Sequence, residues 1–297
     1  MEYLDQYLRH LAHEQNRSEH TLLAYGEDLR SYLEHCRDMV GEDYSPSAGD
    51  LDLVRAWLGA MMQSGLKASS VSRRLAAVKG FYKYLLRVGA VERNPIASLK
   101  APRGEKPLPV YVPTAEIERI LEDLPREDEY AYQLQYLVVA TLYECGLRRS
   151  ELAGLLDRNV DLRQRHLRVR GKGDKERIVP FGIGLAERMA EWRRLRNERF
   201  GSSEVFFLSL SGKPMNGADV YEIVHRLLAT VPNLARRGAH ALRHSFATDM
   251  LNSGADLVAI KELMGHSQVS TTVKYTHTSF RQLQQMYNAH PRAKKKS

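Results

Sequence analysis

The run NPIASLKAPRGEKPLPVYVP, residues 94–113, decides how the chain is divided, because five of its residues are proline. Proline lacks a backbone N–H and restricts the residue before it, so helices end in such a run. The pattern predicts two domains, at residues 1–90 and 113–290, joined by a Pro-rich basic linker at residues 91–112. A short basic tail, residues 291–297, follows the second domain.

Before the linker, four stretches carry apolar residues three and four positions apart, which is the pattern of amphipathic helices. The fourth stretch starts at Ser69 and Ser70 and packs through positions such as Val71, Leu75 and Val78. The sequence therefore predicts a small helical domain at the N-terminal end.

The fourth helix of this domain carries a positive surface. No Asp or Glu occurs between Leu53 and Val91, and positions 79, 83 and 87 place basic side chains on one face of the helix. Such a face fits DNA phosphates, while a solvated surface is the plain alternative. The residues expected to contact DNA are Arg73, Arg74, Lys79, Lys83 and Arg87.

Beyond the linker, the pattern mixes helices with a small β-structure. Residues 166–170 alternate polar and apolar side chains, residues 171–174 form a turn, and residues 177–180 return. A long helix at about residues 128–145 precedes this hairpin, and a short strand at 205–208 interrupts the helices that follow it. The expected fold class is mainly α with a small β-sheet or hairpin, in two domains.

The composition favours a partner with many negative charges and excludes several other classes. The formal net charge is +8, which attracts polyanions without implying sequence reading or catalysis. No apolar run reaches the roughly 20 residues of a membrane-spanning helix, and the first residues lack a secretion signal. Cys36 and Cys145 offer neither a disulfide framework nor a metal-site spacing, so a reducing cytoplasm is the expected location.

Several familiar catalytic motifs are absent from the sequence. It contains no phosphate-binding P-loop, no His-Glu-x-x-His zinc motif, no nucleophile elbow and no dinucleotide fingerprint. A compact Asp/Glu set that could hold two magnesium ions, the usual route to phosphodiester cleavage, is also missing. We therefore expect no metal and no nucleotide cofactor, and any cleavage of DNA would depend on side chains alone.

Residues 238–248, GAHALRHSFAT, contain the first candidates for catalysis. On a helix, Leu242 and Phe246 share one face, whereas His240 and Arg243 stand side by side on another. A guanidinium offers paired donors to phosphate oxygens, and a histidine beside it can move a proton near neutral pH. Taken alone, a His/Arg pair three residues apart is more often surface decoration.

A candidate nucleophile lies further on, at Tyr275. A phenol has an ordinary pKa near 10, so it needs positive charge and a base around it before it can attack. Lys274 and His277 make its segment polar, which is unusual for a core aromatic residue. The plain alternative is a half-buried tyrosine that caps the core.

Five short motifs follow one another along the chain: GLRRSEL at 146–152, GKG at 171–173, HALRH at 240–244, the pair Gly265-His266, and Tyr275. In this order they resemble the tyrosine recombinase or phage integrase family, and in particular its Xer branch, which resolves chromosome dimers. Each motif is weak alone, but the ordered set is specific and spans essentially the whole chain. The resemblance implies a helical SAM-like core-binding domain followed by an α+β catalytic domain.

The resemblance also implies that six residues carry the chemistry: Arg148, Lys172, His240, Arg243, His266 and Tyr275. The two arginines would hold the non-bridging oxygens of the scissile phosphate, where negative charge develops. Lys172 would protonate the departing 5′ oxygen as general acid. His240 would take the proton of Tyr275 or hold the phosphate, and His266 would add a hydrogen bond. The product would be a 3′-phosphotyrosyl bond, which a 5′ hydroxyl can reverse without ATP or metal.

Several neighbouring residues have open alternatives. Lys175 is a rival for the role of general acid, and Arg149 is expected to be a surface or DNA-backbone contact. His244 and His277 are expected to be structural or supporting residues. Glu151 could orient the catalytic arginine of its motif, or it could simply favour the start of a helix.

The function implied by the resemblance is site-specific recombination of duplex DNA, with resolution of chromosome or plasmid dimers at cell division. Four protomers would synapse two sites, as a homotetramer or as a heterotetramer with a related recombinase, and a DNA-translocating cell-division ATPase could control them. Phe280, Leu283 and Met286, at helical spacing, would dock on a neighbouring protomer or on their own domain. An integrase of a phage or conjugative element, a type IB topoisomerase and an inert DNA-binding module are the alternatives.

Overall fold

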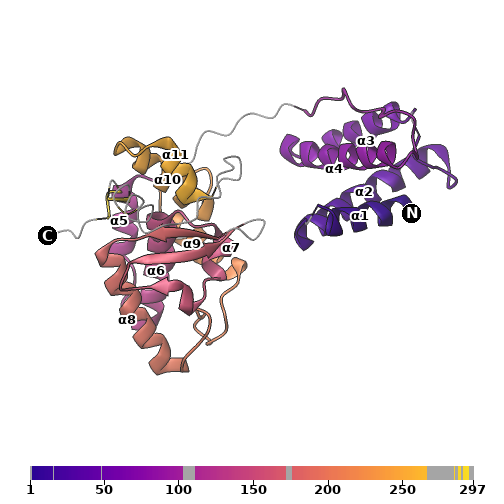
Figure 1. Ribbon diagram of the computed structural model, residues 1–297. Helices are drawn as coiled ribbons and strands as arrows, with labels where there is room; N and C mark the ends of the chain where they lie inside the picture. The colour runs from indigo at the N-terminus through magenta and orange to yellow at the C-terminus, as the bar shows by residue number, and fades with distance from the viewer. Residues whose placement is uncertain are drawn as a thin grey trace. The chain divides into compact units, whose positions relative to one another are not determined.

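The computed structural model describes residues 2–15, 17–47, 49–102, 111–171, 176–265, 284, 287–288 and 290–293. The chain divides into two compact units, residues 1–107 and 108–297. In Figure 1 the first unit runs from indigo to purple, and the second runs from magenta through orange to yellow.

In its described residues, the first unit has four helices around a core rich in aromatic residues. The helices are α1 (Glu2–His13), α2 (Glu19–Val40), α3 (Leu51–Gln63) and α4 (Ala68–Arg87). Tyr32, Trp57 and Phe81 are buried, and the rings of Tyr32 and Trp57 meet edge to face with their centroids 5.3 Å apart. This geometry is favourable for aromatic pairs and fixes α2 against α3.

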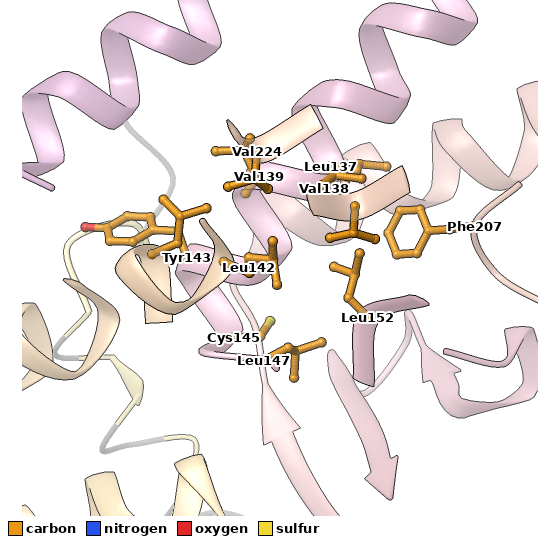
Figure 2. Packing of buried hydrophobic residues seen from close by; sticks show 14 of the residues in the cluster. Leu137, Val138, Val139, Leu142, Tyr143, Cys145, Leu147, Leu152, Phe207 and Val224 are labelled. Atoms are coloured by element: carbon orange, nitrogen blue, oxygen red, sulfur yellow. The ribbon is translucent and has the colours of Figure 1, made fainter. Parts of the chain in front are cut away.

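The second unit is built around α6. Its helices are α5 (Thr114–Glu122), α6 (Glu129–Cys145), α7 (Arg149–Ala153), α8 (Ile183–Phe200), α9 (Gly217–Leu228), α10 (Ala239–Asn252) and α11 (Leu257–Met264), with a 3-10 turn at Asp157–Asn159. α6 contacts α7, α8, α9 and α10 and is buried along most of its length, as expected for a helix whose apolar residues are spread around its circumference. Figure 2 shows Leu137, Leu142 and Cys145 of this helix in the buried cluster that also contains Leu152 and Phe207.

A three-stranded antiparallel sheet completes the second unit. Its strands are β1 (Val160–Asp161), β2 (His166–Arg170) and β3 (Glu176–Pro180), in the order β1-β2-β3. β2 and β3 pair from His166 opposite Pro180 to Arg170 opposite Glu176. The expected hairpin is therefore present, and β1 adds a third strand that the sequence pattern did not predict. The expected fold class, mainly α with a small β-sheet, is confirmed.

The prediction of a strand at residues 205–208 is wrong. The ends of this segment form only isolated β-bridges. The indole of Trp192 donates to the carbonyl of Phe206 at 2.9 Å, and Arg196 donates to the carbonyls of Val205 and Phe206 at 3.1 Å each. Because side chains of α8 take these carbonyls, the segment is anchored to a helix and not to a continuous strand ladder.

The described part of the C-terminal segment docks on its own unit. Tyr287 and Ala293 are buried in a cluster with residues of α10 and α11. Arg292 donates from Nε to Glu144 and from Nη2 to the hydroxyl of Tyr136, at 2.8 Å in both cases. Phe280, Leu283 and Met286, which were expected to dock on a neighbour or on their own domain, lie outside the described residues.

Candidate active site

Arg148 stands at the sharp turn that separates α6 from α7. Gly146 ends α6 with a left-handed conformation (φ +58°), and a Cβ at this position would lie 2.5 Å from the ring of Phe246. Only glycine fits such a turn without strain. The turn places Arg148 at the N-cap of α7, with its side chain 37% exposed.

The side chain of Arg148 is held at two points. Its Nη1 donates to Oε1 of Glu151 and its backbone N–H donates to Oε2, both at 2.7 Å. Its Nη2 donates to the backbone carbonyl of Gly265 at 3.0 Å. Glu151 therefore orients Arg148, the first of the two alternatives left open by the sequence, and it also closes the first turn of α7.

The carboxylate of Glu151 is the centre of the site. It is buried, and both of its oxygens also accept hydrogen bonds from the Nη1 and Nη2 atoms of Arg177, at 2.8 Å each. Burial raises the pKa of Glu151, but the hydrogen bonds and charge of Arg177, together with the hydrogen bonds of Arg148, outweigh burial and hold this pKa at about 2. Glu151 is therefore ionised at neutral pH.

Arg243 approaches the same carboxylate from α10. Its Nη1 lies 3.9 Å from Oε2 of Glu151, and its guanidinium donates to the carbonyls of Gly146 and Met264. Burial, followed by the charges of Arg148 and Arg177, lowers the pKa of Arg243 to about 10. It remains protonated at neutral pH, so three guanidinium groups surround one carboxylate.

His240 lies one turn before Arg243, in the first turn of α10, and it is exposed. Partial burial, followed by the positive charges of Arg243, His244 and Arg236, holds the pKa of His240 below its ordinary value. The imidazole is therefore neutral at neutral pH and can accept a proton.

Three of the six expected catalytic residues, Lys172, His266 and Tyr275, lie outside the described residues, as do the rival Lys175 and His277. The structure brings the other three together: Arg148 lies at the α6–α7 turn, His240 and Arg243 lie near the start of α10, and the two arginines donate to carbonyls at the end of α11. Gly265, which directly precedes His266, is close to this centre, since its carbonyl accepts from Arg148.

Two other neighbours of the motifs lie apart from the carboxylate of Glu151. Arg149 is exposed, with its guanidinium 6.0 Å from the ring centroid of Tyr221 on α9. His244 is bonded within its own helix, where its Nδ1 lies 3.1 Å from the hydroxyl of Thr248. Neither contact involves the residues that surround Glu151.

Arg177 is the residue that sequence reasoning missed. The sequence pattern assigns it only to the returning strand of the hairpin. The signal was present, because Arg177 and Val179 are two positions apart in β3 and therefore lie on the same, inward face. A charged residue at an inward position of a strand predicts a buried ionic partner.

The expected DNA-contacting residues on α4 differ in how they are bound. Arg73 donates to both carboxylate oxygens of Asp28, which is buried on α2, and Nε of Arg74 lies 3.5 Å from the same carboxylate. Lys79 and Lys83 have no hydrogen-bond or ion-pair partner in the described part of the chain.

Arg87, the last of these residues, contacts α1. Its Nη2 lies 3.0 Å from Nδ1 of His10, and its Nη1 lies 3.5 Å from Glu14. Arg73, Arg74 and Arg87 thus each have a partner within the unit, whereas the two lysines between them have none among its described residues.

The described residues contain no cluster of His, Cys, Asp or Glu that could hold a metal ion. Among the same residues, no helix has the length and apolar character needed to cross a membrane.

Two family models match the chain. The model for the phage integrase family matches residues 111–282, and the model for the phage integrase N-terminal SAM-like domain matches residues 4–89. The SAM-like domain expected before the linker is therefore confirmed.

Curated relatives are similar over nearly their whole length. The tyrosine recombinase XerC of Pelobacter propionicus is 39% identical over 297 residues, which cover 99% of this chain and 97% of the relative. The tyrosine recombinase XerC of Chlorobaculum tepidum is 36% identical, over 98% of this chain and 95% of the relative.

Solved structures share the fold. The Tn1549 transposon integrase in complex with transposon right end DNA has a TM-score of 0.70 at 20% identity, covering 94% of this chain and 97% of that chain. The XerH recombinase bound to palindromic difH substrate has a TM-score of 0.68 at 20% identity, covering 92% and 77%. The family models and the curated relatives together show that the chain belongs to the phage integrase family and is a tyrosine recombinase of the Xer type.

Proposed function

We propose that this recombinase cuts and rejoins duplex DNA through Tyr275. The phenolic oxygen attacks the scissile phosphorus, and the bond from phosphorus to the 5′ oxygen breaks as the bond to tyrosine forms. The result is a 3′-phosphotyrosyl link and a free 5′ hydroxyl, and a 5′ hydroxyl from another strand reverses the step. Because one phosphate diester replaces another at each stage, the reaction needs no ATP.

The observation that carries this proposal is the pair of guanidinium groups, Arg148 and Arg243, held around the α6–α7 turn. Each has five N–H donors, of which protein acceptors hold one on Nη1 and one on Nη2. These bonds fix the groups and leave other donors for the non-bridging oxygens of a phosphate. Donors fixed in advance stabilise the negative charge that develops in the transition state.

Proton transfer is assigned to the remaining residues. His240, with its lowered pKa, accepts the proton of Tyr275 or holds the phosphate. Lys172 protonates the leaving 5′ oxygen, and His266 adds a hydrogen bond to the phosphate. These roles rest on the positions of the residues in the family motifs.

A nicked suicide substrate tests the mechanism. Cleavage close to the nick releases a short fragment, so the covalent intermediate cannot be reversed and accumulates. The full-length protein should form a denaturant-resistant adduct with labelled DNA, and Tyr275→Phe should form none. An adduct that persists in Tyr275→Phe would place the nucleophile at another residue.

We further propose that the first unit binds the DNA duplex through α4, with Lys79 and Lys83, which have no partner among the described residues, as phosphate contacts. The expected set also contains three arginines that already form ion pairs within the unit, Arg73, Arg74 and Arg87. Each of them would contact DNA either with this ion pair kept or after breaking it. The Tn1549 transposon integrase, which shares the fold, was solved in complex with transposon right end DNA, and this supports a DNA duplex as the substrate.

Resolution of chromosome or plasmid dimers is the biological role that we propose, since the curated relatives are named tyrosine recombinase XerC. Two sites would be synapsed by four protomers, either identical or paired with a related recombinase, in the cytoplasm and under a DNA-translocating ATPase. Mapping the genomic site crosslinked by Tyr275→Phe tests this role. One chromosomal site supports dimer resolution, whereas a site at the end of a mobile element favours an integrase.

A further inference from the structure

Arg177 on β3 is a buried cation whose three nitrogen atoms are all bonded to the protein. Its Nε donates to the carbonyl of Leu263 at 2.7 Å, and its Nη1 and Nη2 donate to the two oxygens of Glu151 at 2.8 Å each. Its side chain is 6% exposed. We infer that Arg177 is a positioning residue of this recombinase, which fixes Arg148 and Arg243 without touching the DNA; the inference rests on the proposed function.

The carboxylate of Glu151 is held in one orientation by Arg177. A carboxylate that accepts two parallel bonds from one guanidinium has its plane fixed, because both of its oxygens are held. The same two oxygens accept the backbone N–H and Nη1 of Arg148. The direction of Arg148 is therefore set by a carboxylate whose own direction is set by Arg177.

Arg177 also contacts the end of α11. Its Nε holds the carbonyl of Leu263, and its Cδ lies so close to Gly265 that a Cβ there would be 3.2 Å away. The next two carbonyls of this turn bind the other arginines: that of Met264 accepts from Arg243, and that of Gly265 accepts from Arg148. Arg177 thus holds in place the turn whose carbonyls accept from Arg148 and Arg243.

Arg177 also keeps the net charge of the site positive. Glu151 contributes −1 to the site, and Arg148, Arg177 and Arg243 contribute +3, so the four groups sum to +2. Without Arg177 the carboxylate would cancel a larger share of the positive charge of Arg148 and Arg243. A buried ion pair kept only for stability could be replaced by apolar residues at little cost. This one keeps the arginines that face the phosphate from being neutralised.

A lysine cannot take over this role. Its single ammonium cannot reach the carbonyl of Leu263 and both oxygens of Glu151 in one plane, whereas the guanidinium does so with three separate nitrogens. Arg177→Lys keeps the charge and loses the geometry, and Arg177→Met loses both. The double variant Arg177→Met/Glu151→Gln removes the charge of both partners.

The test measures single-turnover formation of the Tyr275 adduct on two suicide substrates. One has a normal scissile phosphate, and the other has a neutral methylphosphonate, which demands less positive charge in the transition state. Rates are taken per folded molecule at saturating DNA. The matched control is Arg196→Met, since Arg196 is also a buried arginine of the same unit, and its described partners are Asp157, Asn197 and backbone carbonyls, not Glu151.

We expect Arg177→Met to slow cleavage of the phosphate about 100-fold, the scale on which small misplacements of catalytic groups act. DNA affinity should stay within a few-fold of wild type. On the methylphosphonate substrate, the difference in cleavage rate between wild type and Arg177→Met should be smaller than on the phosphate. Arg177→Lys should also cleave the phosphate more slowly than wild type. The double variant Arg177→Met/Glu151→Gln should cleave it faster than Arg177→Met. Arg196→Met should lower the unfolding midpoint while cleaving both substrates at the wild-type rate per folded molecule.

The inference is overturned if folded Arg177→Met, or Arg177→Lys where Met does not fold, cleaves the phosphate like wild type. It is also overturned if the loss is equal on the two substrates. Failure of the proposed function looks different: the wild-type protein forms no adduct, or Tyr275→Phe still forms one.

Discussion

Arg243 donates from its guanidinium to the backbone carbonyl of Gly146, 97 residues earlier in the chain. The carbonyl is available because Gly146 leaves the helical path of α6 with φ +58°. Phe246, one helical turn after Arg243, packs on the Cα of the same glycine. One glycine therefore positions the guanidinium of α10 and sets the turn that presents Arg148.

Gly146→Ala is expected to destabilise the second unit by about 2 kcal/mol or more, because a left-handed alanine adds to a clash with the ring of Phe246. Gly254→Ala separates the two costs, since Gly254 has φ +83° and a methyl group added there would meet nothing within 4 Å. That control should lose only about 1 kcal/mol. Urea unfolding compares the variants, and equal losses would show that the contact with Phe246 contributes nothing.

The ionisation of Glu151 predicts a pH-dependent stability. Its pKa is about 2 in the folded protein and 4.5 ordinarily, so the folded state favours the charged form. This contribution is complete above about pH 4.5 and is lost as the pH falls towards 2. A difference of this size corresponds to about 3 kcal/mol.

Unfolding of wild type and Glu151→Gln between pH 3 and pH 7 measures this contribution. The chain has two tryptophans, Trp57 and Trp192, so a Trp57→Phe background leaves Trp192 to report on the second unit. The stability gap between the two proteins should narrow as the pH falls. Glu191→Gln, which alters an exposed ion pair, should show almost no gap at any pH. A difference in the free energy of unfolding between wild type and Glu151→Gln that does not change with pH would contradict the prediction.

The pKa of His240 is expected below 6.5 in the free protein, since burial and three nearby positive groups disfavour the imidazolium. A histidine-selective NMR titration measures it, with His240→Gln to assign the signal among the eleven histidines. Arg236→Gln removes one of the repelling charges and should move the midpoint upward. A midpoint above 6.5, or a downward shift in the variant, would reverse the assigned electrostatics.

Local signals in the sequence predicted several parts of this structure. The helix expected at about residues 128–145 is α6, Glu129–Cys145, which begins after the capping side chain of Asp128 and ends at the left-handed Gly146. The helical period likewise placed His240 and Arg243 together on α10, although Arg243 is buried.

The partners of these residues could not be read from such signals. Arg177 meets Glu151 across 26 residues, and Arg73 meets Asp28 across 45. Periodicity shows which face of an element a residue occupies, but not which distant element lies opposite that face. The strand prediction at 205–208 failed for the same reason, because the carbonyls of Val205 and Phe206 are taken by side chains of α8.

Lys79 and Lys83 are expected to account for a measurable share of the salt dependence of DNA binding. Each phosphate contact releases about 0.9 counterion, so Lys79→Gln/Lys83→Gln should reduce the slope of log K against log salt concentration by about 2. Arg9→Gln/Arg30→Gln removes the same charge from α1 and α2. Binding isotherms at several salt concentrations compare the pairs. An equal reduction in both would mean that the total charge of the unit matters and that α4 has no special role.

Arg73→Ala, by contrast, is expected to act on folding before it acts on DNA. Burial raises the pKa of Asp28, and the charge of Arg73, followed by that of Arg74, opposes this effect. Removing Arg73 leaves the buried carboxylate with Arg74 alone, at a cost of about 1 to 3 kcal/mol. Arg73→Ala/Asp28→Asn should recover most of this loss, because it removes the charge that needs a partner. Urea unfolding followed by Trp57 in a Trp192→Phe background measures both variants in the first unit. If Arg73→Ala keeps the wild-type midpoint and weakens only DNA binding, the guanidinium belongs to the DNA contact surface and Asp28 does not depend on it.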